Sequence, residues 1–193
     1  MGNAATLPYD IAQQIDYNGS INWTLHEASK KVDREELKEN VSLFRVSKTA
    51  NLNDLALAQK TIQKLRTLKH PFVLRFIDTA EMEDSLALVT ESCVPLETWL
   101  ANTNAQNSKD SSETSQHNQE DDPVKLQEIL WGFKCILLAL NFLHTNCSIL
   151  HGNLGIHSIF VTPNGDWKLG GFELAGNMSV QSDMDLFVKN GHL

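Results

Sequence analysis

The sequence predicts an α+β fold in which a small β-sheet with one helix precedes a mainly helical part. Short runs of strand-forming residues crowd the first half of the chain, and two longer segments have apolar residues at helical spacing. The chain has 193 residues and 41% hydrophobic content, which is enough to bury a core. We therefore expect a packed globular unit with strands first and helices later.

Strands and one amphipathic helix are expected before residue 70. The run VSLFRV (41–46) is the best strand candidate because β-branched and aromatic residues dominate it. Between 51 and 69, apolar residues recur at spacings of three and four, which predicts a helix. Asn51 or Asn53 would cap its start, and His70-Pro71 would end it.

A hairpin is expected next, from the short apolar runs at 73–77 and 86–90 and the acidic turn segment between them. Pro123 then fits the first turn of a helix that runs to about Asn146, and its apolar residues cover so wide an arc that we expect a buried helix. A last hairpin has strands at 158–162 and 167–171, with Asn164-Gly165 in the turn.

The composition changes abruptly between residues 101 and 122. Two alanines are the only hydrophobic residues there. The segment has five acidic residues and one lysine, which gives it a net charge of −4. Such a segment cannot bury enough apolar surface to offset the entropy of ordering, so we interpret it as a disordered insertion. An acidic docking site is the functional alternative.

Overall composition limits the class of protein. The net charge of −8 argues against binding to nucleic acid, because phosphate recognition needs clustered Lys and Arg. The three cysteines form no C-x-x-C pair, so neither a disulfide framework nor a zinc site is predicted. We predict no membrane-spanning segment or secretory signal, and an intracellular protein.

The first residues, MGNAAT, match the pattern for N-terminal acylation, with Gly2 as the modified residue and Thr6 at the hydroxyl position. Coincidence in a flexible tail is the alternative. One acyl chain would give only a marginal, peripheral membrane contact.

Several segments resemble protein kinases in order and spacing. HPFVL follows the first helix, LVTES corresponds to a strand and hinge, LHGNLGIHSIFV to the catalytic loop, and WKLGGFEL to the metal-binding motif. The resemblance implies a two-lobed protein-kinase-like fold with the small-lobe sheet and helix and the first part of the helical large lobe. It divides the chain into a flexible tail (1–20), a small lobe and hinge (21–100), the insertion (101–122) and a partial large lobe (123–193).

The groups that perform phosphoryl transfer are missing at the matching positions. A kinase uses a strand Lys paired with a helix Glu, a loop Asp beside the substrate hydroxyl, and an Asn and an Asp on Mg²⁺. By this alignment the degenerate positions are Phe44, Thr61, Asn153, Ser158 and Gly171. The chain is therefore predicted not to be an enzyme, and no metal is expected.

Other segments are more specific, namely KLRTLKHP, LVTESCVPL, ILLALNFLH, CSILHGN and GDWKLGGFE. Together with the degenerate site, they resemble the Scy-like pseudokinase family (N-terminal kinase-like protein). The resemblance implies a cytoplasmic scaffold that associates with the Golgi. It would act in vesicle traffic between Golgi and endoplasmic reticulum, with coatomer among its protein partners. Because the match stops inside the kinase-like domain, we expect a partial gene product.

Three functions remain open. The first is the inactive scaffold. The second is an ATP-binding switch without phosphotransfer, in which the main chain at hinge positions Thr90 and Glu91 would face the adenine; ATP is possible there but is not expected. The third is a weak atypical kinase that uses relocated residues such as Asp166 and Lys168, which are more simply interpreted as a solvated pair on a hairpin.

Overall fold

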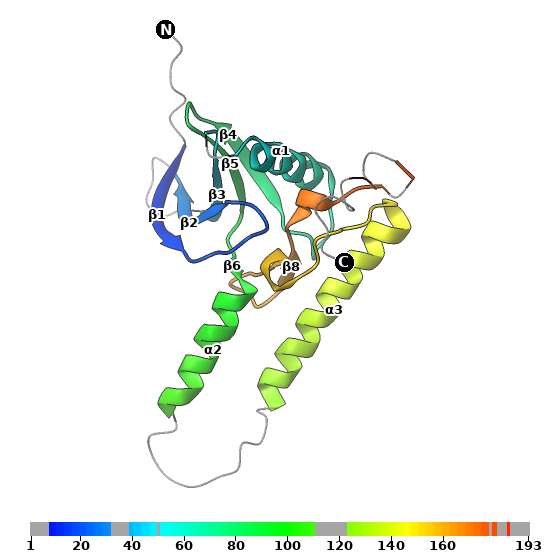
Figure 1. Cartoon of the computed structure of the whole chain (residues 1–193). Coiled ribbons are helices and arrows are strands. Elements are labelled where there is room, and N and C mark those ends of the chain that lie inside the picture. The colour runs from blue at the N-terminus through cyan, green and yellow to red at the C-terminus, as the bar shows by residue number, and fades with distance from the viewer. Residues whose placement is uncertain are drawn as a thin grey trace.

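The computed structural model describes residues 8–31, 39–49, 51–110, 123–177, 179–180 and 185, with only the backbone described at 104–110 and 123–124. Gly2 and most of the insertion, residues 111–122, lie outside these ranges. An antiparallel sheet with one helix forms the first part, and two long helices extend away from it (Figure 1). The predicted α+β, kinase-like architecture is confirmed.

The main sheet has five strands in the order β1-β2-β3-β5-β4. Their bounds are β1 Tyr9–Ile15, β2 Thr24–Lys30, β3 Asn40–Ser47, β4 Phe76–Glu81 and β5 Ser85–Glu91. All neighbouring pairs are antiparallel, and Phe44 at the centre of β3 lies opposite Leu25 of β2 and Leu88 of β5. A central strand with β-branched and aromatic residues buries both faces, as the burial of β3 shows.

Helix α1 (Leu52–Thr67) packs on one face of this sheet. Asn51 caps it, because its side chain accepts a hydrogen bond from the backbone N–H of Asn53. The helix therefore starts and ends within two residues of the predicted bounds.

The second part begins with the short strand β6 (Val94–Pro95) and helix α2 (Leu96–Asp110). Helix α3 (Pro123–Asn146) follows, then the short helix η2 (Ile156–Ser158), the hairpin β7 (Ile159–Val161) and β8 (Trp167–Leu169), and the short helix η3 (Phe172–Leu174). Strands β6, β7 and β8 form a small second sheet. Gly165 takes a positive φ of 82° in the hairpin turn, as the Asn-Gly prediction requires.

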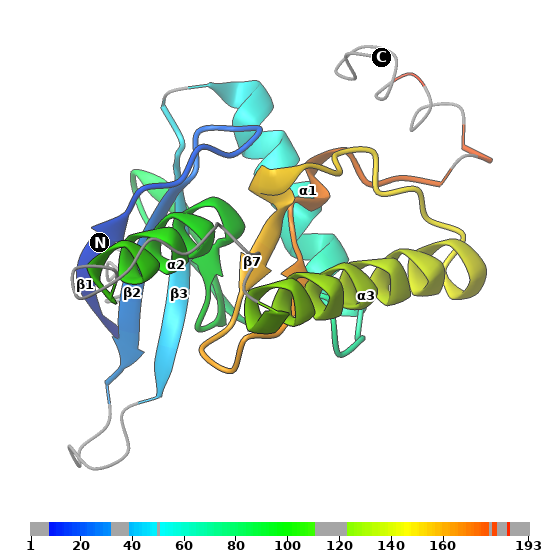
Figure 2. The same ribbon diagram turned by 90° about the horizontal axis from the view of Figure 1, so that it is seen from below.

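One hydrophobic core joins the two parts. It includes residues of β2, β3 and α1 together with Cys135, Ala139 and Leu143 of α3 and Phe160 and Leu169 of the hairpin. In the view of Figure 2, one end of α3 lies next to the β7–β8 hairpin, and α1 lies behind the hairpin. The two parts are therefore packed against each other in a closed arrangement.

The bounds of three predicted segments were wrong. Tyr9–Ile15 forms an edge strand on β2, so the predicted flexible tail does not extend to residue 20. Strand β4 starts at Phe76 rather than residue 73, and it takes up part of the predicted acidic turn. Helix α2 continues to Asp110, ten residues into the predicted insertion, because residues 101–110 include neither Gly nor Pro, the two residues least compatible with a helix.

Helix α3 has the predicted bounds, but the prediction that it is buried all round was wrong. Its inner face packs on the β7–β8 hairpin, whereas Leu126, Leu130, Phe133 and Leu137 are each more than half exposed. In the described part of the chain, only one side of the helix has neighbours. By length and composition alone, Lys125–Asn146 is also the one described helix apolar enough to cross a membrane, which is weak support for such a role.

Candidate functional site

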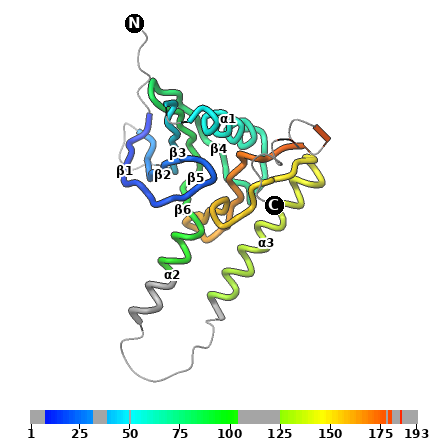
Figure 3. Tube along the Cα trace, in the orientation of Figure 1, coloured from blue at the N-terminus to red at the C-terminus, as the bar shows by residue number. Residues whose placement is uncertain are grey.

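The degenerate positions gather between the main sheet and the loops around η2 and η3. Strand β3 supplies Phe44, α1 supplies Thr61, and the segment from Leu150 to Glu173 supplies Asn153, Ser158 and Gly171. The connection between β1 and β2 runs across the sheet towards this segment (Figure 3). The structure thus brings all five residues of the predicted site into one region.

An aromatic cluster fills the centre of this region. Phe44 is 3% exposed, and its ring centroid lies 5.8 Å from that of Tyr17 and 5.4 Å from that of Phe160, both in edge-on geometry. Trp23 adds a third ring at 6.1 Å. The cavity that remains between these rings measures about 10 Å³, which is room for one water molecule at most.

Thr61 lies on α1 at the edge of the same cavity and is 3% exposed. Its hydroxyl has no hydrogen-bond partner among the described residues. Neither Phe44 nor Thr61 carries a charge, so no ion pair links β3 to α1 at these positions.

Glu173 is the polar centre of the site, although it is not among the five degenerate positions predicted from the sequence. Its carboxylate, 2% exposed, accepts hydrogen bonds from Trp23 Nε1 at 2.9 Å, Ser20 Oγ at 3.3 Å and Asn153 Nδ2 at 3.1 Å. Asn153 also donates to the backbone oxygen of Gly171 at 3.1 Å. These bonds tie the β1–β2 connection to the loop that follows α3.

Asn153, which the sequence alignment predicts to stand at the position of the catalytic carboxylate, therefore serves as a donor in this network. Its oxygen accepts from His157 Nε2 at 3.1 Å. An amide has no basic oxygen that could take a proton from a substrate hydroxyl. The side chain holds neighbouring elements together instead.

Gly171 adopts a left-handed conformation, with φ 67° and ψ 46°. A Cβ atom at this position would lie 2.7 Å from Ser158 Cβ, closer than carbon atoms pack. The Ser158 hydroxyl is engaged with the backbone of Gly155, donating at 2.8 Å and accepting at 3.0 Å. Neither position offers a ligand for Mg²⁺, and no cluster of three or more His, Cys, Asp or Glu exists among the residues described.

His151 is buried beside this loop, 2% exposed. Its Nε2 donates to the carbonyl of Gly170 at 2.8 Å, and its Nδ1 accepts from the backbone N–H of Asn153 at 3.3 Å. Burial lowers the pKa of His151 to about 4. The imidazole is therefore a neutral, packed group that supports the loop.

A second connection fixes the β1–β2 segment to α1. Asp54, 6% exposed, accepts from the backbone N–H of Asn22 at 3.2 Å and from its side-chain amide at 2.7 Å. Tyr17 Oη donates to the backbone oxygen of His157 at 3.1 Å. A segment held at Tyr17, Asn22 and Trp23 cannot lift away without breaking these bonds.

The hinge positions Thr90 and Glu91 lie at the end of β5. Thr90 is fully buried, and the backbone N–H of Glu91 donates to Arg75 O at 3.1 Å. Two residues further on, the Ser42 hydroxyl accepts from the backbone N–H of Cys93 and donates to its carbonyl, both at 2.9 Å. The N–H groups of Glu91 and Cys93 are therefore already bonded within the chain.

Lys168 and Asp166 do not form the solvated pair expected from the sequence. Lys168 is nearly buried and donates to the carbonyl of Pro71, and its Nζ lies 4.0 Å from Glu91 Oε2. Asp166 accepts from Trp131 Nε1 at 3.4 Å. Both side chains have partners on other parts of the chain.

Comparison with known proteins identifies relatives that share the protein kinase domain or resemble Scy1. The protein kinase domain family matches residues 28–191. The "Probable inactive serine/threonine-protein kinase scy1" of Dictyostelium discoideum is 30% identical over 90% of this chain and 18% of its own length. The "Protein-associating with the carboxyl-terminal domain of ezrin" of Mus musculus is 35% identical over 59% of this chain and 13% of its own.

A solved structure described as "Crystal structure of Cex1p" shares the fold, with a TM-score of 0.68 and 19% identity over 98% of this chain and 32% of that one. Human SCY1-like protein 2 is 25% identical over 96% of the chain. The chain spans a quarter or less of the length of these curated relatives. It belongs to the protein kinase domain family, and its relatives there are the Scy1-like proteins, of which one is named as inactive.

Proposed function

We propose that the chain is a catalytically silent kinase-fold scaffold whose nucleotide cleft is filled by its own side chains. The observation that carries this proposal is the aromatic cluster around Phe44, which leaves a void of only about 10 Å³ between its rings. No adenine ring fits between these rings. Opening the void would separate rings that stabilise the core by about 0.5–1.5 kcal/mol per pair beyond their burial.

The chemistry of the site supports the same conclusion. Phosphoryl transfer depends on charge stabilisation by a lysine and metal ions, and on a carboxylate near the attacking hydroxyl. Phe44, Asn153 and Gly171 supply an apolar ring, an amide donor and no side chain. The lysine, the carboxylate and the metal ligands of a kinase act together on one transition state. Regaining one of them alone is therefore not expected to restore phosphoryl transfer.

Calorimetric titration with ATP, with and without Mg²⁺, tests the proposal, with an active protein kinase measured in parallel as the control. We expect no saturable heat and no transfer of labelled phosphate to the chain or to a generic protein substrate. Saturable ATP binding without transfer would instead support the nucleotide switch, and transfer would support the atypical kinase. Either result would overturn the silent-cleft proposal.

The cellular role is proposed from the resemblance to the Scy-like pseudokinase family. A protein-association role fits the printed name of the mouse relative, which states association with the carboxyl-terminal domain of ezrin. For this chain we propose a cytoplasmic, Golgi-associated role in vesicle traffic, with coatomer as a candidate partner. Co-precipitation of coatomer, and imaging of the chain beside its Gly2→Ala variant, test the partner and the acylation separately. Failure to recover coatomer would remove it as a partner, and unchanged localisation of the variant would remove the acyl anchor.

A further inference from the structure

We propose that the groove between α2, α3 and the β7–β8 turn binds a basic peptide segment of a partner protein, with a Lys or Arg side chain between Trp99 and Trp131 and its charge at Glu128. This inference rests on the scaffold function proposed above, and it names a surface that such a scaffold would use. The groove lies on the other side of the hinge from the filled cleft.

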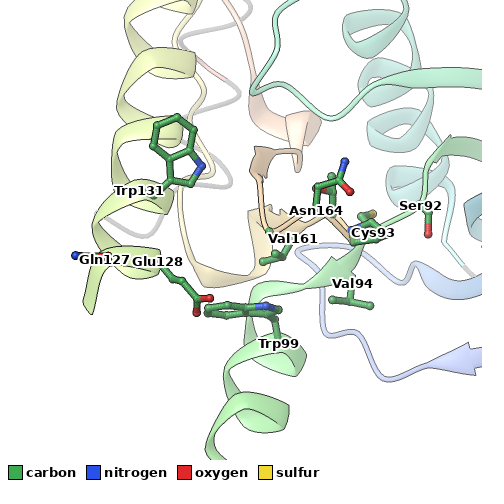
Figure 4. Close-up of a pocket in the computed structure, with 12 residues that line it drawn as sticks. Ser92, Cys93, Val94, Trp99, Gln127, Glu128, Trp131, Val161 and Asn164 are labelled. Carbon is green, nitrogen blue, oxygen red and sulfur yellow. The ribbon is translucent and has the colours of Figure 1, made fainter. Parts of the chain in front are cut away.

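The groove has a volume of about 630 Å³, within the roughly 300–1,000 Å³ typical of ligand sites. It is lined by Trp99 of α2, by Glu128 and Trp131 of α3, and by the apolar residues Val94, Val161 and Pro163. Figure 4 shows the Glu128 carboxylate directed towards the Trp99 ring, with Trp131 further along the same helix. The spacing of three residues places Glu128 and Trp131 on one face of α3.

Both tryptophans are held in place by other aromatic rings. The centroid of Trp99 lies 6.2 Å from that of Trp167, and the centroid of Trp131 lies 6.1 Å from that of Phe72. Trp131 also donates to Asp166, yet 43% of its surface stays exposed. A large exposed ring that is already fixed loses little conformational entropy when a ligand binds.

The charge of the groove selects a cationic occupant. Among the described lining residues, Glu128 is the one acidic side chain, and no Lys, Arg or His lines the groove. The ammonium of Lys134 lies 5.2 Å from the ring centroid of Trp131, so an incoming cation has to displace it from that ring. Carboxylate and indole together favour an incoming Lys or Arg.

The chain's own α2–α3 connection is a poor occupant. Residues 111–122 contain four acids and no Lys or Arg, so Glu128 would repel them. The apolar lining residues Val94 and Val161 would accept a neighbouring apolar residue of the peptide.

The test uses the 193-residue chain and a phage-displayed library of random twelve-residue peptides. Selected peptides are synthesised with a fluorescent label, and their affinities for the chain and its variants are measured by anisotropy. We expect peptides that combine Lys or Arg with an apolar residue. Glu128→Lys is expected to weaken their binding at least about tenfold, and Glu128→Gln and Trp131→Ala by several-fold.

Glu83→Lys is the matched control, because it makes the same charge change at an exposed position in the β4–β5 turn. It should leave affinity within about twofold. If no basic peptides are selected, or if Glu83→Lys and Glu128→Lys weaken binding equally, the groove proposal is wrong. The phosphotransfer and ATP measurements are independent of this result, so failure here would leave the silent cleft standing, whereas ATP binding would remove the silent cleft without affecting the groove.

Discussion

Acidification is expected to destabilise the chain through His151. Its ring is buried and neutral, with Nε2 bonded to Gly170 and Nδ1 accepting from Asn153. Burial is the main cause that lowers its pKa to about 4, and the nearby His157 and His144 add to the effect. The bond to Gly170 opposes the shift without cancelling it.

The sign and size follow from proton linkage. An unfolded chain binds a proton at this histidine with a pKa near 6.5, whereas the folded chain binds it only near pH 4. The free energy of unfolding is therefore highest above pH 6.5 and falls as the pH drops towards 4. For a shift of this size, the His151 contribution between pH 7.5 and pH 5 is a loss of about 2 kcal/mol.

Urea unfolding at pH 7.5, 6.5 and 5, followed by tryptophan fluorescence, measures this loss. His151→Gln is the comparison, because an amide can donate to Gly170 but does not titrate. Burial also lowers the pKa of His26 and of His70, but their contributions occur in both proteins and cancel in the difference. Equal pH dependence in the two proteins, or an NMR titration that places the pKa of His151 above 6, would refute the reasoning.

Three substitutions test the filled cleft, each by urea unfolding. Glu173→Ala removes the acceptor of three hydrogen bonds and should lower the free energy of unfolding by about 3 kcal/mol; a loss below about 1 kcal/mol would mean that Glu173 does not hold the β1–β2 connection. Gly171→Asp combines a positive φ with a 2.7 Å contact, so it should cost about 2 kcal/mol or more without creating Mg²⁺ binding in calorimetry; a saturable Mg²⁺ signal would contradict this. Phe44→Lys places a cation among aromatic rings and should cost about 3–5 kcal/mol without restoring ATP binding; a stable variant that binds ATP would show that the cleft can open.

The elements that were predicted well from the sequence are those determined by residues within the element itself. Helix α1 has an Asn51 cap and regular apolar spacing, and α3 starts at a proline and ends near residue 146. The hairpin around Gly165 has its turn residues in place. In each case the residues that determine the element lie within the element itself.

Strand β1 was missed because its support is not local. Only Tyr9 and Ile15 are buried in it, and their burial depends on the distant strands β2, β3 and β5. Five of its seven residues are exposed, so no alternating pattern marks it. The exposed face of α3 was mispredicted for a different reason. The spacing of apolar residues shows which faces of a helix could be buried, but not whether another element packs on each of them.

The site was predicted as a set of absences, whereas the structure also shows what replaced the missing groups. Alignment identified Phe44, Asn153 and Gly171 but could not pair Glu173 with Trp23, which is 150 residues away in sequence. Nor could it pair Ser42 with Cys93, 51 residues apart. These partners meet only once the sheet and the loops are packed together.

The replacements explain why no single reversal should restore catalysis. In the proposed silent cleft, Phe44, Tyr17 and Phe160 pack together where the adenine would bind, and the Glu173 hydrogen bonds hold the β1–β2 connection in place. An acid at Gly171 would have to displace Ser158, whose hydroxyl fixes the neighbouring loop at Gly155. Each reversal would therefore break packing that the other positions still maintain, so the free-energy costs of combined reversals should not be additive. The site has become part of the core, and its side chains now stabilise the contact between the two parts of the fold.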